Sequence, residues 1–427
     1  MTQHVVILGG GTGGTLVANR LRRLASSDEM EIVVVDQDDQ HVYQPGLLFV
    51  PFGLTHPEDI VRPRARQLHR GISFVESAVD RVEIEANEVH LANGQVLGYD
   101  VLVVATGTVL VTEETEGLTG PGWMDKVFTF YSAEGAAALE PALAAFDGGR
   151  VVVNVVDMPI KCPIAPLEFC FLADWYFRER GIRDRVELIY VTPLDGAFTK
   201  PVASDRLGGM LAEKGIEMVT EFNTGTVDCV DGVDGRLVAY DGREVAFDLA
   251  VVVPLHGGAD YVGRSPGLGD ALNFVTTDEH TLQSKAAPNI FAIGDAANVP
   301  TSKAGSVTHF EGETVVDNVR RFLAGEPLLE GFDGHANCFI ETGFHKALLI
   351  DFNYDTEPLP GHYPSKVGLS LLKESRLNHL GKLMFQWFYW HSLLPGRDIP
   401  GIRPEMPTAG KDLTPAADQP IEERTEQ

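Results

Sequence analysis

A glycine-rich loop near the start of the chain has the residue types and spacing that bind a dinucleotide. The loop consists of Gly9, Gly11, Thr12, Gly13 and Gly14 and fits the pattern G-x-G-x-x-G. In this pattern the first glycine makes a tight turn, the second lets backbone N–H groups approach a pyrophosphate, and the third lets a helix pack closely on a strand. A buried strand at residues 4–8, a helix at 16–24 and a second strand at 31–35 ending in Asp36 stand in the required order. Asp36 is therefore expected to bind ribose hydroxyls, and a plain glycine turn is disfavoured.

The four cysteines are the other residues with obvious chemical potential. Cys162, Cys170, Cys229 and Cys338 lack the spacing of a zinc site, and no metal site is predicted. The N-terminus leads directly into the first strand, so we expect no signal peptide and no framework of structural disulfides. These cysteines are therefore expected to be catalytic or buried.

Length and charge limit the classes of function. The chain has 427 residues, which suggests two intertwined domains and a tail. Its net charge of −27 argues against nucleic-acid binding. It has no run of eighteen uncharged apolar residues, so no membrane-spanning helix is predicted. The arginines at positions 62, 64, 66 and 70 are interpreted as a solvated helix face rather than as phosphate ligands.

Two later motifs extend the nucleotide site. A strand at residues 100–104 ends in Ala105, Thr106 and Gly107, and a strand at 289–293 ends in Gly294 and Asp295. With the first loop, these motifs resemble the FAD-binding half of the flavoprotein reductases that have two dinucleotide domains. The resemblance covers residues 4 to about 325 and implies an α/β fold with two Rossmann-like domains, with Asp295 holding the ribityl chain of FAD. It also implies that a helix beginning near residue 305 points its N-terminus at the flavin; Lys303 either adds positive charge there or is a surface lysine.

The second nucleotide position departs from that family. A strand at residues 150–157 is followed by residues 158–166, which contain three prolines and no glycine. Side chains would stand where a pyrophosphate needs bare backbone, so binding of NADH or NADPH is disfavoured. Cys162 occupies this segment at the start of a predicted helix, where the helix dipole and Lys161 would favour a thiolate. The alternative, a small buried residue, is the interpretation favoured for Cys170 and Cys229.

Further segments identify a narrower resemblance. Lys161-Cys162-Pro163, Asn337-Cys338, residues 351–354 and Glu357-Pro358 resemble the sulfide:quinone oxidoreductases with two redox cysteines, over residues 4 to about 395. The resemblance implies a Cys162–Cys338 disulfide attacked by sulfide, FAD as electron carrier and ubiquinone or menaquinone as acceptor. It also implies a proton-carrying role for Glu168, whose alternative is to satisfy the helix dipole, and it makes Phe344 and Lys346 candidate quinone contacts.

Departures from the family pattern bear on how FAD is attached and on which related enzyme classes are disfavoured. Residues 127–131 contain no thiol that could tether the cofactor, so FAD should be non-covalent, and residues 198–200 lack the histidine found in some relatives. The flavin subunit of a flavocytochrome c sulfide dehydrogenase is opposed by the missing signal peptide. A type II NADH:quinone oxidoreductase is opposed by the missing middle glycines. A flavin-binding redox sensor would leave an aromatic C-terminal helix unexplained.

That C-terminal helix predicts a membrane contact. Its apolar face consists of Leu380, Leu383, Met384, Trp387 and Phe388, and Lys382 contributes to the surrounding positive charge. We expect residues 366–397 to lie on the surface of the cell membrane, which makes the protein peripheral; a homo-oligomer contact is the alternative. The predicted division is an FAD-binding domain from residues 1–110 and 245–330, a second Rossmann-like domain at 111–244, a C-terminal region at 331–403 and a disordered acidic tail at 404–427.

Overall fold

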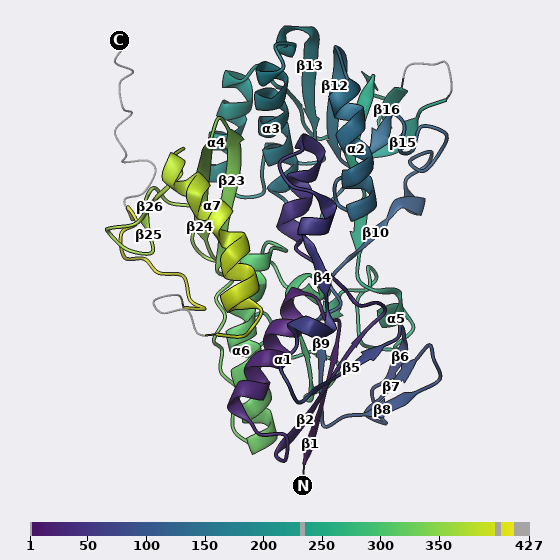
Figure 1. Cartoon of the computed structure of the whole chain (residues 1–427), viewed down its shortest axis with the longest axis vertical. Helices are drawn as coiled ribbons and strands as arrows, with labels where there is room; N and C mark the ends of the chain where they lie inside the picture. The colour runs from purple at the N-terminus through teal and green to yellow at the C-terminus, as the bar shows by residue number, and fades with distance from the viewer. Residues whose placement is uncertain (1, 231–234, 398–402, 414–427) are drawn as a thin grey trace.

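Two parallel sheets, one above the other in Figure 1, form the body of the protein. The structure is a computed structural model that describes residues 2–230, 235–397 and 403–413. In the first sheet the strand order is β21-β9-β1-β2-β5, and in the second it is β11-β18-β12-β13-β14. Helices pack against both sheets, and the central strands β9 and β18 are continuous buried apolar runs, as expected for parallel sheets covered on both faces. The edge strands β5 and β14 are only partly buried.

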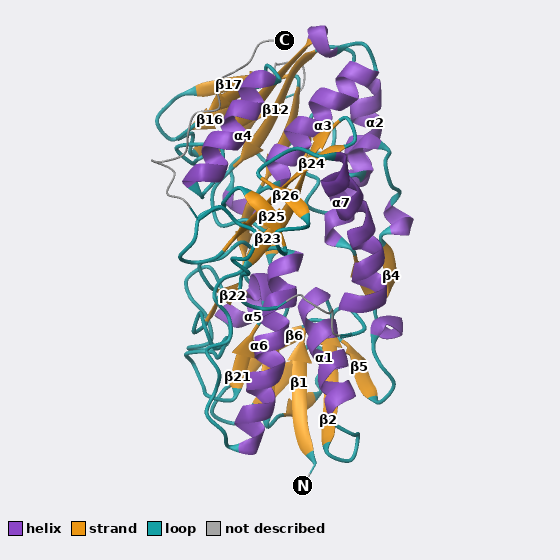
Figure 2. Ribbon diagram, turned by 90° about the vertical axis from the view of Figure 1, so that its left-hand side faces the viewer, coloured by secondary structure: helices purple, strands orange, loops and turns teal. Residues whose placement is uncertain are grey.

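The first sheet positions the glycine loop. Its strands are β1 (Gln3–Leu8), β2 (Met30–Asp36), β5 (Ile72–Glu76), β9 (Val101–Val104) and β21 (Ile290–Ala292). Helices α1 (Thr12–Leu24) and α6 (Gly305–Ala324) pack against each other beside it, as Figure 2 shows. Because the strands are parallel, the loops that follow β1, β2, β9 and β21 meet at one edge.

The second sheet repeats this architecture. Its strands are β11 (Val127–Phe128), β12 (Gly149–Val155), β13 (Val186–Val191), β14 (Glu217–Val219) and β18 (Leu249–Val253), with helices α2 (Ala133–Ala145), α3 (Ala165–Glu179) and α4 (Pro201–Glu213). Strand β18 pairs in parallel with β12, so the segment 249–253, expected in the first domain, is part of the second sheet. The return to the first domain therefore comes later than residue 245, because β18 lies between β11 and β12 in the second sheet.

Small antiparallel sheets complete both halves. They are formed by β6 (Val79–Glu83), β7 (Glu88–Leu91) and β8 (Val96–Gly98), and by β15 (Thr224–Asp228), β16 (Gly235–Ala239) and β17 (Glu244–Phe247). Two antiparallel pairs are β3 (Gln40–Val42) with β4 (Val61–Pro63) and β10 (Val109–Val111) with β19 (Leu255–Gly257). A further pair, β20 (Val275–Thr276) with β22 (Ala297–Asn298), is parallel. Helix α5 (Asp260–Gly263) is a single turn that contacts β6.

The C-terminal region lies alongside both halves. The hairpin β23 (Ala336–Gly343) and β24 (Lys346–Phe352) packs on α3, and helix α7 (Arg376–Phe388) packs on the hairpin before continuing into a π-helix at Tyr389–Leu393. A further pair, β25 (Gly361–Tyr363) and β26 (Leu369–Leu371), lies beside it. No helix in the described ranges is long and apolar enough to cross a membrane.

The expectation of a disordered tail from residue 404 is wrong for its first part. Met406 is buried, and the backbone of Lys411 pairs with Gly361. The Lys411 side chain is also buried, because its ammonium forms an ion pair with Asp351 of β24. The remainder of that tail, residues 414–427, lies outside the described residues.

Candidate active site

The glycine loop has the geometry of a phosphate-binding turn. Gly9 has φ of +93°, and a Cβ on it would lie 2.4 Å from the carbonyl oxygen of Ala105. A Cβ on Gly14 would lie 1.8 Å from the carbonyl oxygen of Gly9, so only glycine allows α1 to pack this closely. At Gly11, by contrast, a Cβ would have no atom within 4 Å, which leaves its backbone open to a ligand. Helix α1 has no acidic residue in its first turn and no side-chain cap, so its free N–H groups and dipole suit a phosphate.

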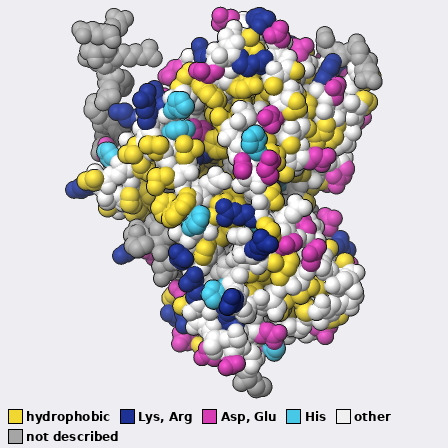
Figure 3. Space-filling model, in the orientation of Figure 1, with side chains coloured by type: hydrophobic (Ala, Val, Ile, Leu, Met, Phe, Trp, Pro, Cys, Tyr) yellow, Lys and Arg dark blue, Asp and Glu magenta, His cyan; other side chains and the backbone are white. Residues whose placement is uncertain are grey.

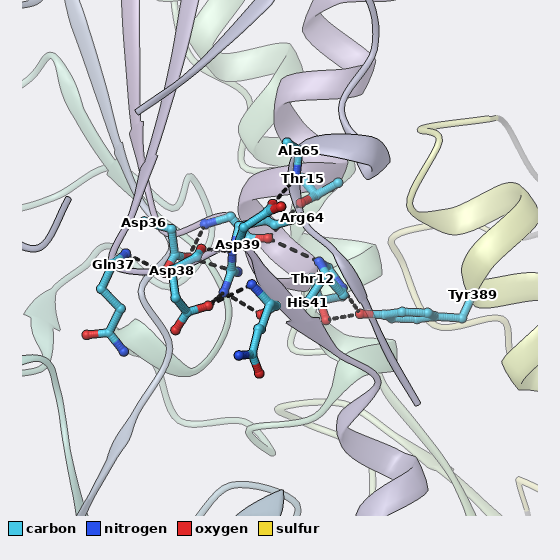
Figure 4. Close-up of polar contacts among 12 residues, drawn as sticks. Thr12, Thr15, Asp36, Gln37, Asp38, Asp39, His41, Arg64, Ala65 and Tyr389 are labelled. Carbon is cyan, nitrogen blue, oxygen red and sulfur yellow. Dashed lines mark hydrogen bonds and ion pairs between the residues drawn. The ribbon is translucent and has the colours of Figure 1, made fainter. Parts of the chain in front are cut away.

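Asp36 ends β2 beside this loop and is already held in place (Figure 4). Its Oδ2 accepts a hydrogen bond from the Gly10 N–H at 2.7 Å and lies 2.8 Å from Nη1 of Arg64. Burial raises the pKa of Asp36, and the Arg64 guanidinium acts in the opposite direction. The interpretation of Arg64 as part of a solvated face is wrong, because its side chain is buried and also contacts Asp38. No spacing signal in the sequence marked Arg64 as different from the neighbouring arginines.

The ends of β9 and β21 complete this edge of the first sheet. Ala105 donates its N–H to the carbonyl of Leu8, and the Thr106 hydroxyl lies 3.3 Å from that of Tyr261. Gly107 has φ of +68°, and a Cβ there would meet no atom within 4 Å. The backbone after β9 is therefore accessible beside the glycine loop.

Lys303 holds the turn that follows β21. Its ammonium donates to the carbonyls of Asp295 and Ala297, at 2.9 and 2.8 Å, and so is not a free surface group. Burial raises the pKa of the Asp295 carboxyl, while Lys303 and Lys161 lower it. Glu311 accepts from the Gly294 N–H at 2.5 Å, and burial raises its pKa to about 7.

Cys162 and Cys338 both reach the N-terminal end of α6. Cys162 lies in the loop between β12 and α3 with φ of +45°, and its N–H donates to the Lys303 carbonyl at 2.5 Å. Cys338 lies on β23, whose Asn337 carbonyl accepts a hydrogen bond of 2.6 Å from the Ser306 hydroxyl of α6. Both are free thiols, and Cys338 is near enough for its charge to raise the pKa of Cys162.

The surroundings of both thiols oppose ionisation. Burial is the main cause that raises the pKa of Cys162, and it raises that of Cys338 to about 12; the charge of Glu168 is the next cause for each. Lys382 lowers both pKa values. The Lys161 ammonium donates to the Tyr131 carbonyl and to Gln44. Burial lowers the pKa of Lys161 and the charges of Asp295 and Cys162 raise it, so stabilisation of the Cys162 thiolate by Lys161 stays a prediction.

A series of buried polar contacts connects the region of the cysteines with α7. Glu168 of α3 forms an ion pair with Lys382 of α7 and accepts from the Glu341 N–H at 2.7 Å. The Glu341 carboxylate in turn lies 2.9 Å from Nδ1 of His379. Burial raises the pKa of Glu168, and Lys382 opposes that shift. Lys382 is the functional candidate that sequence reasoning assigned only to a surface charge cluster. Its i, i+3 spacing from His379 on the same helix was the available signal.

Other predicted residues lie elsewhere. Cys170 and Cys229 are 1% and 7% exposed, in agreement with a packing role. Phe344 and Lys346 lie in the exposed turn of the β23–β24 hairpin, and Phe344 is about 20 Å along the strand from Cys338. The hairpin therefore does not bring these two residues to the cysteines.

Helix α7 has an exposed apolar face. The five residues of the predicted face are 38–58% exposed, and Leu377 extends it. In Figure 3 hydrophobic side chains gather on the side of the molecule where Figure 1 draws α7. Lys382 does not belong to a surface charge cluster, because it points inward to Glu168.

Comparisons with known proteins agree with this architecture. Residues 3–154 match the family model of pyridine nucleotide-disulphide oxidoreductases. The crystal structure of the sulfide:quinone oxidoreductase from Aquifex aeolicus superposes with a TM-score of 0.77 at 22% identity, covering 93% of this chain and 92% of that one. Residues 3–154 thus resemble the pyridine nucleotide-disulphide oxidoreductases, and the fold of the chain resembles that of a solved sulfide:quinone oxidoreductase.

Two relatives in sequence are similar to most of this chain. The mitochondrial sulfide:quinone oxidoreductase of Dictyostelium discoideum is 29% identical over 396 residues, which are 92% of this chain and 86% of that protein. The type II NADH:quinone oxidoreductase of Staphylococcus aureus is 29% identical over 347 residues, covering 76% of this chain and 83% of that protein. Of these two relatives, the sulfide:quinone oxidoreductase is similar to the larger share of this chain.

Proposed function

We propose that this protein is a sulfide:quinone oxidoreductase that oxidises sulfide at Cys162 and Cys338. The observation that carries the proposal is the meeting of two cysteines, from separate elements, at the N-terminal end of α6 beside the nucleotide-binding edge of the first sheet. The oxidoreductase class and the named relatives support the same reaction.

The flavin is proposed to be non-covalent FAD. The residues that would hold it are Gly9, Gly11, Thr12, Gly13, Gly14, Asp36, Ala105, Thr106, Gly107, Gly294, Asp295 and Lys303. When bound, FAD supplies a two-electron acceptor that reoxidises the thiol pair and passes the electrons to a quinone. Tyr131 fills the region where a tethering cysteine would stand, and its hydroxyl donates to the Cys162 carbonyl. Acid denaturation should therefore release all of the flavin into the supernatant; flavin that stays with the precipitate would contradict the non-covalent assignment.

The reaction begins at the oxidised cysteine pair. Hydrosulfide attacks one sulfur of a Cys162–Cys338 disulfide, so a persulfide forms on that cysteine as the S–S bond breaks, and the other leaves as a thiolate with the bonding pair. Lys382 is the buried cation that stabilises the released thiolate. Glu168, paired with Lys382, is placed to take and return the proton that accompanies this charge.

Quinone and membrane are proposed to approach from the α7 side. Its exposed apolar face would lie in the membrane interface as a peripheral contact, and ubiquinone or menaquinone could enter from there. In this proposal Phe344 and Lys346 contact the quinone at the edge of the membrane-facing surface and not beside the cysteines. A homo-oligomer interface is the competing use of the same face.

The deciding experiment compares two reductants. The yellow protein is mixed anaerobically with sulfide or, separately, with NADH, and flavin absorbance is followed. We expect sulfide to bleach the flavin rapidly and NADH to act poorly, because residues 158–164 carry side chains and dock on the Lys303 segment instead of forming a glycine turn. Rapid bleaching by NADH but not by sulfide would assign the protein to the NADH dehydrogenases.

A further inference from the structure

The π-helix that follows α7 inserts a tyrosine hydroxyl into the glycine loop. Tyr389 is 1% exposed, and its hydroxyl lies 2.8 Å from Oγ1 of Thr12 and 2.6 Å from Nε2 of His41. Figure 4 shows Tyr389 reaching from the C-terminal ribbon to these two side chains. A residue 377 positions away in the chain thus bonds the second variable position of G-x-G-x-x-G.

The donor and acceptor of each hydrogen bond between Thr12, Tyr389, His41 and the Gly10 carbonyl can be assigned. The Gly10 carbonyl can only accept, so the His41 Nδ1 at 3.1 Å must carry the proton. Burial and the nearby Arg64 lower the pKa of His41 to about 4, so the ring is neutral and its Nε2 accepts from the Tyr389 hydroxyl. Tyr389 is then left to accept from Thr12, whose hydroxyl proton is committed to the tyrosine and not to a phosphate.

These hydrogen bonds set the direction of the backbone in the glycine loop. The Gly10 carbonyl is held from two sides, by His41 and by the Thr15 hydroxyl at 2.9 Å. In a trans peptide the C=O of one residue and the N–H of the next point in opposite directions. Holding the Gly10 carbonyl therefore aims the Gly11 N–H away from His41, and a Cβ built on Gly11 meets nothing within 4 Å.

The same C-terminal segment is anchored to α1 by its backbone. Asn19 donates to the Leu394 carbonyl at 2.7 Å, and Arg23 donates to the Pro395 carbonyl at 2.8 Å. Trp390 packs edge-on against the His41 ring and under the Arg62 guanidinium, 4.1 Å from its ring centre. Without a break in the chain, this buried end continues from the exposed apolar face of α7.

We propose that Tyr389 and His41 are positioning residues of the dinucleotide phosphate site, and that seating the apolar face of α7 on a lipid bilayer slows loss of the flavin. The proposal rests on the proposed function, which supplies both the FAD and the membrane contact. It assigns the phosphate to backbone N–H groups of the loop, with Thr12 acting through its bond to Tyr389.

The test measures flavin release by the whole protein. Flavin fluorescence is followed after dilution of wild-type, Tyr389→Phe and Tyr190→Phe proteins, with and without vesicles of phosphatidylcholine and phosphatidylglycerol. Tyr190→Phe is the matched control, because it also removes a buried tyrosine hydroxyl bonded to a threonine, Thr192, but in the second sheet. We expect Tyr389→Phe to release flavin about three- to tenfold faster, the effect of one neutral hydrogen bond, while Tyr190→Phe matches the wild type.

Vesicles separate the two parts of the proposal. They should slow flavin release from the wild type but have a smaller effect on Tyr389→Phe, because the link between helix and loop is weakened. Release from Tyr389→Phe at the wild-type rate would overturn the positioning role. Vesicle binding without any change in release would overturn the coupling and leave the membrane contact intact, whereas failure to bind vesicles would overturn the membrane contact and the lipid effect together.

Discussion

Cys162 and Cys338 lie in surroundings that favour their protonated thiol form, and one nearby cation favours the thiolate form. Burial and Glu168 raise the pKa values of both, and Lys382 is the cation that lowers them. In the proposed mechanism, a nucleophile that attacks a Cys162–Cys338 disulfide releases a thiolate near the positive charge of Lys382, which makes the departing sulfur a better leaving group. We therefore propose that the ion pair between α3 and α7 controls the reactivity of the two cysteines.

The first prediction concerns the four cysteines. Cys162→Ser and Cys338→Ser should each reduce sulfide-dependent quinone reduction by roughly a thousandfold or more, with the double variant little worse, because the two residues act as a unit. Cys170→Ser and Cys229→Ser should keep turnover and lose about 1–3 kcal/mol of stability, since each places a hydroxyl in a buried site. All five variants are assayed after confirming bound flavin. Near-full turnover by Cys338→Ser would contradict the disulfide mechanism.

The second prediction concerns the pH dependence of thiol reactivity. Glu168→Gln removes the carboxylate that disfavours both thiolates while Lys382 remains, so the pKa of Cys338, about 12, should fall. Iodoacetamide should then alkylate the reduced protein faster at pH 8, and the profile of rate against pH should move to lower pH. Glu179→Gln is the matched control, because Glu179 is exposed at the end of the same helix. An unchanged profile for Glu168→Gln would rule out this electrostatic control.

At the scale of elements, α7 and the π-helix that follows it lie in two different environments on one continuous segment. Its exposed side carries the predicted apolar face, whereas its continuation at Tyr389–Leu393 is buried against α1 and the glycine loop. Lys382 points inward from the middle of the helix to Glu168. A deletion of the whole segment would therefore remove part of the nucleotide-binding half, and only side-chain substitutions separate membrane contact from folding.

The third prediction uses such substitutions. Replacing Leu380, Met384 and Trp387 together by serine should weaken vesicle binding by about a hundredfold or more, because each side chain is more than half exposed and free to enter lipid. Flavin content should be unchanged. Tyr240→Ser is the control, since Tyr240 is an exposed aromatic, 80% accessible, outside α7. Cosedimentation of the triple variant with vesicles at wild-type levels would favour another use of the face.

At the scale of the whole molecule, the end of the described residues packs onto the β23–β24 hairpin. Lys411 lies 2.5 Å from Asp351, which is also 2.8 Å from Nε2 of His335 and accepts from Asn337. Both side chains of the ion pair are fully buried. Because Asn337 precedes Cys338 and pairs with Asp351 in the hairpin, the tail supports the strand that carries the second cysteine.

The fourth prediction tests this support. Lys411→Met should destabilise the protein by about 3–5 kcal/mol, because it leaves the buried Asp351 carboxylate without its ammonium partner. The measurement is the urea midpoint of unfolding, compared with Lys366→Met, which removes an exposed lysine and should have almost no effect. Equal midpoints for the two variants would show that the Lys411 pair contributes nothing to stability.

Local sequence determined the parts of this protein that depend on backbone sterics and periodicity. The glycine loop was predictable because a Cβ at Gly9 or Gly14 would collide with backbone, and the exposed face of α7 followed from helical spacing. The absence of glycine after β12 likewise needed only the sequence. The tertiary structure alone decided that Lys382 pairs with Glu168, 214 positions away, and that Tyr389 bonds Thr12. The physical reason is that a charge or hydroxyl on a helix carries no mark of its partner, which is set by how distant elements pack.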